Sequence, residues 1–312
     1  MLRTSKNSRE YWRDREIEHA RSMLKDDYKV VDRIEGYYRD AAREIEKEIS
    51  VALTNYASRS GLSMEDVIKL ASETDVRDFE RKAARYVREK NFSPRANREM
   101  AIYNLKMRLS RMELLLMYID LELIALSDGV EGLVYERLIE VGMEELRRQA
   151  GILGESLQMD RTGIDYIAKR QFHGDDFSNR IWKNKRALHA ELEQRLSEAV
   201  ISGQSPIEVA RKLRQNVESN VFNSERLLIT ETARVQSQVQ IESFKDMGIN
   251  QYEFIATEGA CDVCKPLDGK IFYVIEAMPG ENMAPVHPFC RCSVAAYVDR
   301  EAWDANLRAR GL

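Results

Sequence analysis

The segments Cys261-Asp-Val-Cys264 and His287-Pro-Phe-Cys290-Arg-Cys292, separated by 22 residues, hold all four cysteines of the chain. A Cys-x-x-Cys pair brings two thiolates together on a tight turn, and the second segment adds an imidazole and two more thiolates. Tetrahedral zinc takes four ligands of these kinds. The pattern therefore predicts one structural zinc per chain, with five candidate ligands for four positions: Cys261, Cys264, His287, Cys290 and Cys292.

Spacing leaves the choice between Cys290 and Cys292 open, because their side chains point apart if the segment is extended. Three thiolates and one imidazole around a zinc ion carry one net negative charge. Lys265 and Arg291 lie beside the ligands in the sequence, where they could offset that charge, or they could be ordinary solvated loop charges.

Two disulfides are the competing interpretation of the cysteines. The segment Met1–Glu10 lacks the apolar core of a signal peptide, so we expect reduced thiols and a metal site. A catalytic zinc would need an open coordination position and a general base, for which Glu258 and Asp262 are the nearest acids in sequence. A His-Asn-His type of nuclease would need a second histidine near His287, and the nearest one before it is His189. We therefore expect a closed structural site, no catalytic residues and no enzyme activity.

The composition indicates a mainly helical chain. Of its 312 residues, 44% are hydrophobic and 32% are charged, with only 15 glycines and 6 prolines, as amphipathic helices require. The net charge of −4 gives no overall attraction to nucleic acid, so any such contact must be local. The apolar run Leu114–Ile119 is followed by Asp120 and Glu122, and no stretch is long enough to be a membrane span.

Periodicity divides the chain into three consecutive segments. Residues 1–126 are expected to form an amino-terminal helical bundle, and residues 127–220 a helical middle region with a flexible connector near 151–178 that holds one short helix. Residues 221–312 are expected to form a helix and a small three-stranded α+β element stapled by zinc. Loss of the zinc should then unfold this element and leave the amino-terminal helices intact.

Individual elements follow from local signals. Apolar residues recur every three or four positions from Arg9 to about Leu53, and Asp128-Gly129 with Gly132 suggest a break between two helices. Ser205-Pro-Ile-Glu208 is a capping box with proline at the first helical position. Further helices are expected from Ser63, at 74–90, 97–126, 133–149, 181–200 and 224–247, and in the tail from Asp299; strands are expected at 251–256, 271–274 and 293–298.

The order of motifs in the second half resembles the Mu F-like minor head proteins of tailed bacteriophages. The likeness is distinct over residues 177–298 and looser over the first half, where Tyr11-Trp12-Arg-Asp-Arg15 precedes a long charged helix. One departure is Ala260, where the family often has a polar residue before the first cysteine. The motifs are Phe177-Ser-Asn-Arg-Ile-Trp182, Arg226-Leu-Leu-Ile-Thr-Glu-Thr-Ala233, Cys261-Asp-Val-Cys264-Lys-Pro-Leu-Asp-Gly269, Pro279-Gly280-Glu-Asn and His287-Pro-Phe-Cys290-Arg-Cys292.

This resemblance implies a virion protein of the phage head, present in few copies, assembled in the host cytoplasm and associated with the portal protein and other head proteins. It implies a role in head morphogenesis, with effects on DNA packaging or ejection in some members, and no enzyme activity of its own. The alternatives are a nucleic-acid-binding zinc protein and a zinc-dependent, nuclease-like enzyme. Weak contact with packaged DNA would use the basic cluster Arg180, Lys183, Lys185 and Arg186, although such a cluster on a helix is usually a solvated face. Glu231 and Arg234 are expected to form an ordinary intrahelical ion pair.

Overall fold

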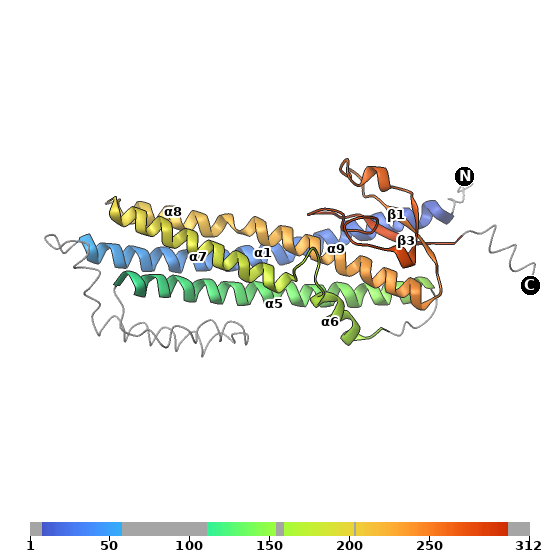
Figure 1. Cartoon of the computed structure of the whole chain (residues 1–312), viewed down its shortest axis with the longest axis horizontal. Coiled ribbons are helices and arrows are strands. Elements are labelled where there is room, and N and C mark those ends of the chain that lie inside the picture. Colours follow the sequence, from blue (N-terminus) through green and yellow to red (C-terminus); the bar gives the residue numbers. More distant parts are fainter. Residues whose placement is uncertain (1–7, 58–110, 154–158, 203, 299–312) are drawn as a thin grey trace, which may run out of the picture. The chain divides into compact units, whose positions relative to one another are not determined.

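The computed structural model describes residues 8–57, 111–153, 159–202 and 204–298. The helices expected from Ser63 and at 74–90, the start of the one at 97–126 and the tail from Asp299 lie outside these residues. The mainly helical fold class is confirmed, with a small carboxy-terminal sheet after the helices (Figure 1). The helices are α1 (Ser8–Ala57), α5 (Arg111–Leu153), α6 (Arg161–Lys169), α7 (Phe177–Ile201), α8 (Pro206–Ser219) and α9 (Val221–Asp246).

The chain folds into two compact units, each built from stretches that are distant in sequence. The first unit comprises Met1–Val30, Val134–Phe177 and Glu225–Leu312, and the second comprises Val31–Leu133 and Ser178–Ser224. The expected division into three consecutive segments stays a prediction, because it concerns which stretches fold independently.

The apolar periodicity of the first helix is confirmed by burial along α1. Its predicted face is in the core, while the intervening charged residues are mostly exposed. Each fully buried aliphatic side chain contributes roughly 1.5–3 kcal/mol relative to an exposed one. Packing of this face therefore stabilises the helix more than the intrinsic helix propensity of its residues does. The buried members are Ala20, Met23, Val31, Ile34, Tyr38, Ala41, Ile45 and Ile49.

The expected break near Asp128-Gly129 and Gly132 is wrong, because α5 is continuous from Arg111 to Leu153. A glycine inside a helix costs roughly 1 kcal/mol relative to alanine, which burial of flanking apolar side chains such as Val130 readily offsets. Gly129 also has a packing role, since a Cβ placed there would lie 2.8 Å from the ring of Tyr37. The glycine therefore admits a neighbouring aromatic side chain and does not end the helix.

The second unit is fixed by buried polar contacts among its helices. The indole of Trp182, at the end of the first motif, is fully buried and donates to Glu131 Oε2 at 2.6 Å. The hydroxyls of Tyr38 and Ser224 are 2.9 Å apart, which links α1 to the start of α9. The motif beginning at Phe177 thus supplies packing in the described structure.

Helix α8 begins where the sequence predicted, with Pro206 at its first position. The capping box does not form, since the Ser205 side chain makes no cap hydrogen bond. Glu208 instead pairs with Lys212 at 2.8 Å, one turn further along the helix. Proline at the first position is sufficient to start a helix here, because its fixed φ suits the first turn.

The three predicted strands are present as an antiparallel sheet of order β2-β1-β3. They are β1 (Gln251–Ile255), β2 (Ile271–Tyr273) and β3 (Ser293–Tyr297), each one residue shorter than expected. The central strand β1 is buried on both faces: Tyr252 and Phe254 point to one face, where they pack in two neighbouring apolar clusters, and the buried Glu253 and Ile255 point to the other. The sheet is therefore an internal support of the cysteine region.

Gly142 of α5 is a tight contact in the first unit. A Cβ there would lie 2.4 Å from the Cγ2 atom of Ile164 and 3.3 Å from Val235, and both neighbours are fully buried. We expect Gly142→Ala to lower the free energy of unfolding by about 1–3 kcal/mol through overpacking. The matched control is Gly132→Ala in the same helix, which has open space and should raise stability by about 0.4–1 kcal/mol. Urea unfolding followed by circular dichroism measures both, and equal effects would contradict the packing role.

Candidate metal centre

The first cysteine pair lies on a tight turn after β1. The backbone N–H groups of Cys264 and Lys265 both donate to the carbonyl of Cys261, at 3.1 and 3.0 Å. This turn leads into the short 3-10 helix Lys265–Leu267 and then to Gly269, whose φ of +73° is in the region that glycine favours. The local chain thus brings the two thiols of the pair together, as the spacing predicted.

The second segment is held in an unusual backbone conformation. Phe289 has a φ of +62°, which an aromatic residue rarely adopts, and its N–H donates to Thr230 Oγ1 at 3.1 Å. The N–H of Cys290 donates to the carbonyl of His287 at 3.1 Å, so the segment reverses within four residues. This turn brings His287 and Cys290 to the same side, and α9 supplies part of what holds it there.

All five predicted residues meet at one place in the first unit. Cys261 Sγ and His287 Nε2 are 3.1 Å apart, and Cys264 Sγ and Cys290 Sγ are 3.8 Å apart. The ligand atoms form two groups, each within 4.8 Å, that share Cys264: Cys261, Cys264 and His287, and Cys264, Cys290 and Cys292.

The separation between two of the sulfur atoms fits a metal ion. Two sulfur atoms bound to one tetrahedral zinc, at bonds of about 2.3 Å, lie about 3.8 Å apart, which is the separation of Cys264 and Cys290. Soft thiolates with one imidazole are the donor set that zinc and other thiophilic metals prefer. The cluster could therefore bind a metal. Both Cys290 and Cys292 lie with Cys264, so the geometry does not choose between them.

Hydrogen bonding within the cluster favours thiolate at two of the sulfur atoms. Contacts with the thiols of Cys264 and Cys292 lower the pKa of Cys290 to about 2, and the contact with Cys290 raises the pKa of Cys264 and of Cys292. The backbone N–H of Cys264 lowers the pKa of Cys261. The cluster thus contains thiolates that accept hydrogen bonds from neighbouring thiols. A metal cation that replaced the protons of those thiols would be bound by sulfur atoms already in position.

The cluster belongs to the core of the sheet. Cys264, Cys290 and Cys292 are buried with Phe254 and Ala284, while Cys261 is exposed. A metal held here would connect the turn after β1 to the segment before β3. The arrangement resembles a structural site, in which the ligands are also packing residues.

Arg291, between the last two cysteines, is not a solvated loop charge. Its side chain is only 10% exposed and pairs with Asp27 of α1, and its guanidinium also donates to Thr232 Oγ1 at 3.1 Å. Asp27 is fully buried and accepts from Arg137 Nε at 2.9 Å and from Thr232 Oγ1 at 2.9 Å. Lys265, by contrast, is 64% exposed and lies 3.5 Å from Asp262.

Sequence reasoning missed these supports, although one signal was present. Thr230 and Thr232 belong to the motif on α9, and each contacts the segment that carries the last two cysteines. The motif on α9 therefore stabilises the conformation of the cysteine motif through these two hydrogen bonds. Asp27 had no such signal, because it lies 264 positions from Arg291 and stands in a polar stretch in which Lys25, Tyr28 and Lys29 are exposed.

The pair Glu231–Arg234 is more than the ordinary ion pair expected. The two side chains are 2.6 Å apart and essentially inaccessible to solvent. Arg234 also donates from Nη1 to the carbonyl of Ile167 at 2.9 Å and from Nη2 to that of Ala168 at 3.0 Å. These carbonyls end α6, so Arg234 caps that helix with a positive charge and attaches it to α9.

A second buried polar cluster joins α1 to β3. The Glu16 carboxylate accepts hydrogen bonds from Nη1 and Nη2 of Arg148, at 2.6 and 2.9 Å, and from the hydroxyl of Ser293 at 2.9 Å. Burial raises the pKa of Glu16. Burial acts in the same direction on Glu145, but the charge of Arg148 and the hydrogen bonds from His19 and Arg148 together outweigh it and lower the pKa of Glu145 to about 2. The residue directly after Cys292 is therefore attached to the amino-terminal helix.

The residues considered for other functions are placed as follows. Glu258 pairs with Arg21 on the surface, and the Asp262 side chain is fully exposed, so neither carboxylate is enclosed with the cysteines. Lys185, from the basic cluster on α7, is buried and pairs with Asp120. No described helix is long and apolar enough to cross a membrane.

Comparison with known proteins gives one match. The sequence model of the family described as "Phage Mu protein F like protein" matches residues 190–295. No curated protein and no solved structure matches the chain. The matched segment contains all five candidate ligands, α8, α9 and the sheet except its last residues, and the motif at Phe177 lies before it. The similarity to Mu F-like phage proteins is confirmed over this segment.

Proposed function

We propose that this chain is a minor head protein of a tailed phage that joins the head at the portal vertex and acts in head morphogenesis. The family match indicates a phage head protein and carries the proposal. Contact with the portal protein, and an influence on DNA packaging or ejection, are parts of the proposal that go beyond the family match. The packing of the matched segment supports a structural role, because its motif residues hold helices, sheet and cysteines together.

The cysteine cluster is proposed to bind one structural zinc, held by Cys261, Cys264, His287 and one of Cys290 and Cys292. The S–S separation and donor types support zinc. Within a small sheet, metal binding contributes directly to the free energy of folding. Four protein ligands would leave no position for substrate, which agrees with a chain that performs no chemistry.

Two alternatives have less support. A nuclease-like zinc enzyme needs a general base beside the metal, and the nearest acids in sequence, Glu258 and Asp262, are exposed and lie beside cations. A nucleic-acid-binding protein needs an exposed basic surface, and Lys185 of the proposed cluster is buried against Asp120. Contact with packaged DNA is proposed only as weak and local, since the net charge is −4.

Zinc content tests the metal proposal directly. Protein purified without added zinc should contain about one zinc per chain, because the four ligands form a single tetrahedral site. Elemental analysis together with thiol titration makes the measurement. A metal content far below one per chain, with four freely reactive thiols in the folded protein, would exclude the site.

Incorporation into heads tests the function. In cells infected with phage that lacks this protein, the intact chain supplied from a plasmid should restore infectious heads and be found in them by quantitative mass spectrometry. Its copy number per head should be far below that of the major capsid protein. Absence of the intact chain from purified heads would disprove the proposed function.

A further inference from the structure

One sulfur atom of the cysteine cluster is open to solvent, and the other three are not. Cys261 is exposed on the turn after β1, whereas Cys264, Cys290 and Cys292 are buried. A reagent dissolved in water therefore reaches the cluster first at Cys261 Sγ. Oxidation of cysteines follows their exposure and their thiolate character, and a bound metal keeps its sulfur ligands deprotonated. Cys261 is thus the position at which an oxidant would enter the site.

A second sulfur atom lies within reach of the exposed one. Cys261 Sγ and Cys264 Sγ belong to one group of ligand atoms that all lie within 4.8 Å of one another. The N–H of Cys264 donates to the carbonyl of Cys261 at 3.1 Å, which closes a turn of four residues. Such a turn places its first and last Cα atoms less than about 7 Å apart, and disulfides span about 4.4–6.8 Å between Cα atoms. A disulfide between these two cysteines therefore needs little movement of the backbone.

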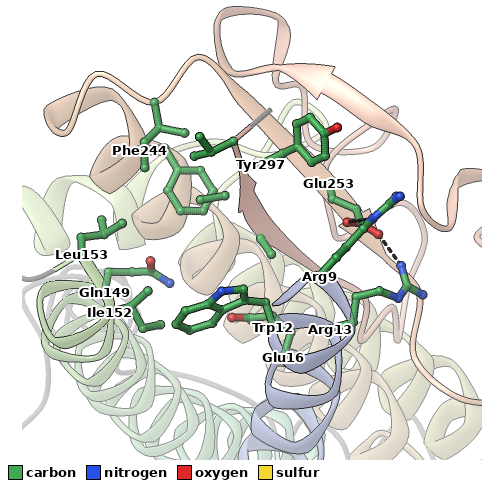
Figure 2. Close-up of a pocket in the computed structure, with 14 residues that line it drawn as sticks. Arg9, Trp12, Arg13, Glu16, Gln149, Ile152, Leu153, Phe244, Glu253 and Tyr297 are labelled. Atoms are coloured by element: carbon green, nitrogen blue, oxygen red, sulfur yellow. Dashed lines mark hydrogen bonds and ion pairs between the residues drawn. The ribbon is translucent and has the colours of Figure 1, made fainter. Parts of the chain in front are cut away.

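The turn is anchored at both ends by contacts that use no sulfur atom. Asp268, after the turn, accepts from Arg13 of α1 at 2.8 Å and from the N–H of Ala256, before the turn, at 2.9 Å. Figure 2 shows Arg13 and Arg9 of α1 beside Glu253 of β1, to which both donate, at 2.6 and 2.7 Å. These contacts hold the ends of the turn in place while its two sulfur atoms react.

Loss of these two sulfur atoms removes the metal site as a whole. Among the residues that the structure describes, every group of three candidate ligand atoms contains Cys264. If Cys264 and Cys261 pair with each other, the candidates left are His287, Cys290 and Cys292, which form no such group. Tetrahedral zinc takes four ligands, so oxidation of the turn and retention of the metal exclude each other.

We propose that the cysteine cluster is a redox switch, in which peroxide replaces the zinc by a disulfide between Cys261 and Cys264. The switch rests on the zinc site and the head function proposed above, and it specifies how that site is regulated. A phage head is assembled inside a cell, where thiols stay reduced, and persists outside it, where disulfides form. The cluster is then metal-bound during assembly and open to oxidation in the released head.

The reaction balances with hydrogen peroxide as the oxidant. The Cys261 thiolate attacks one peroxide oxygen, the O–O bond breaks, and the departing hydroxide takes a proton to become water. The Cys264 thiolate then attacks the sulfur of the sulfenic acid formed at Cys261. The S–S bond forms as the S–O bond breaks, and the second hydroxide also becomes water. Two thiolates are oxidised, one peroxide is reduced to two waters with two protons from solvent, and zinc is released as Zn²⁺.

Peroxide titration of the purified, zinc-loaded chain tests the switch. One equivalent of hydrogen peroxide should release the zinc, which a colorimetric chelator measures, and should leave two of the four cysteines reactive in a thiol titration under denaturing conditions. A thiol reductant with added zinc should restore the bound metal. Peroxide destroyed beforehand by catalase is the control and should release none.

Peptide mapping identifies the pair. Trypsin cuts after Lys270 and Arg291, so Cys261 and Cys264 share one peptide and the other two cysteines lie in separate ones. The oxidised chain should give the shared peptide lighter by two hydrogens. A disulfide that joins two peptides, such as one between Cys264 and Cys290, whose Sγ atoms are 3.8 Å apart, would overturn the proposed pair.

A trap for sulfenic acids locates the point of entry. Dimedone present during oxidation should label Cys261 and leave the three buried cysteines unlabelled, because only Cys261 is exposed. First labelling of a buried cysteine would overturn the proposed route. Zinc that stays bound in excess peroxide would overturn the switch and leave the zinc site standing, whereas a chain without zinc before treatment would overturn both.

Discussion

Replacement of Cys264 by serine is expected to abolish metal binding and unfold the sheet. Cys264 is the residue shared by both groups of candidate ligands, so its loss breaks the site whichever of Cys290 and Cys292 is the fourth ligand. Structural zinc contributes about 10–16 kcal/mol in small zinc peptides, which matches or exceeds the whole stability of a typical domain, about 5–15 kcal/mol. The effect should be the largest of any single substitution in the chain.

The damage should extend beyond the sheet. Sequence reasoning expected the amino-terminal helices to survive loss of the zinc, but Arg291 pairs with Asp27 and Ser293 with Glu16, and both acids are in α1. We now expect the first part of α1 to lose protection as well, because these buried acids would lose their partners.

Hydrogen exchange and zinc analysis of Cys264→Ser measure this outcome. Lys265→Ser, at the neighbouring exposed position, is the control and should keep both zinc and fold. Retention of one zinc and of a folded sheet in Cys264→Ser would refute the proposed site. Loss of zinc with full protection of residues 8–30 would instead restore the separable element expected from the sequence.

Replacement of Asp27 by alanine is expected to lower the free energy of unfolding by about 3–5 kcal/mol. Asp27 is fully buried between Arg137 and Arg291, and its removal leaves two largely buried guanidinium groups without their shared counter-charge. Burial already lowers the pKa of Arg291, which shows how unfavourable an unpaired charge would be there. The substitution should also weaken zinc retention, since Arg291 lies between two candidate ligands.

The adjacent residue provides the control for this prediction. Asp26 is 42% exposed and pairs with Lys29 on the surface, so Asp26→Ala should change stability by less than about 1 kcal/mol. Asp27→Asn keeps hydrogen-bond acceptance and removes the charge, and its effect should be intermediate. Urea unfolding of the three variants gives the comparison. Equal effects at positions 26 and 27 would show that the buried network contributes little.

Local sequence patterns were sufficient for the parts of this protein that depend on near neighbours. The spacing of apolar residues predicted α1, because one helical face recurs every three or four positions. Pro206 predicted the start of α8, and the alternation after Gly248 predicted the strands and the cysteine turn between β1 and β2. Two short turns, each complete within four residues, present four of the five candidate ligands, and Cys292 follows the second turn.

Contacts between distant stretches were decided only by the tertiary structure. Gly129 and Gly132 looked like a break, but packing of α5, including the ring of Tyr37 on Gly129, keeps the helix continuous. By sequence, Arg291 could offset the charge of a metal site or be a solvated loop charge, and only the fold pairs it with Asp27, 264 residues away. A sequence pattern reports only on residues a few positions apart. The partner of a buried charge depends instead on which helix faces pack together. The sequence therefore indicated where a metal could bind, and the fold alone decided what supports that site.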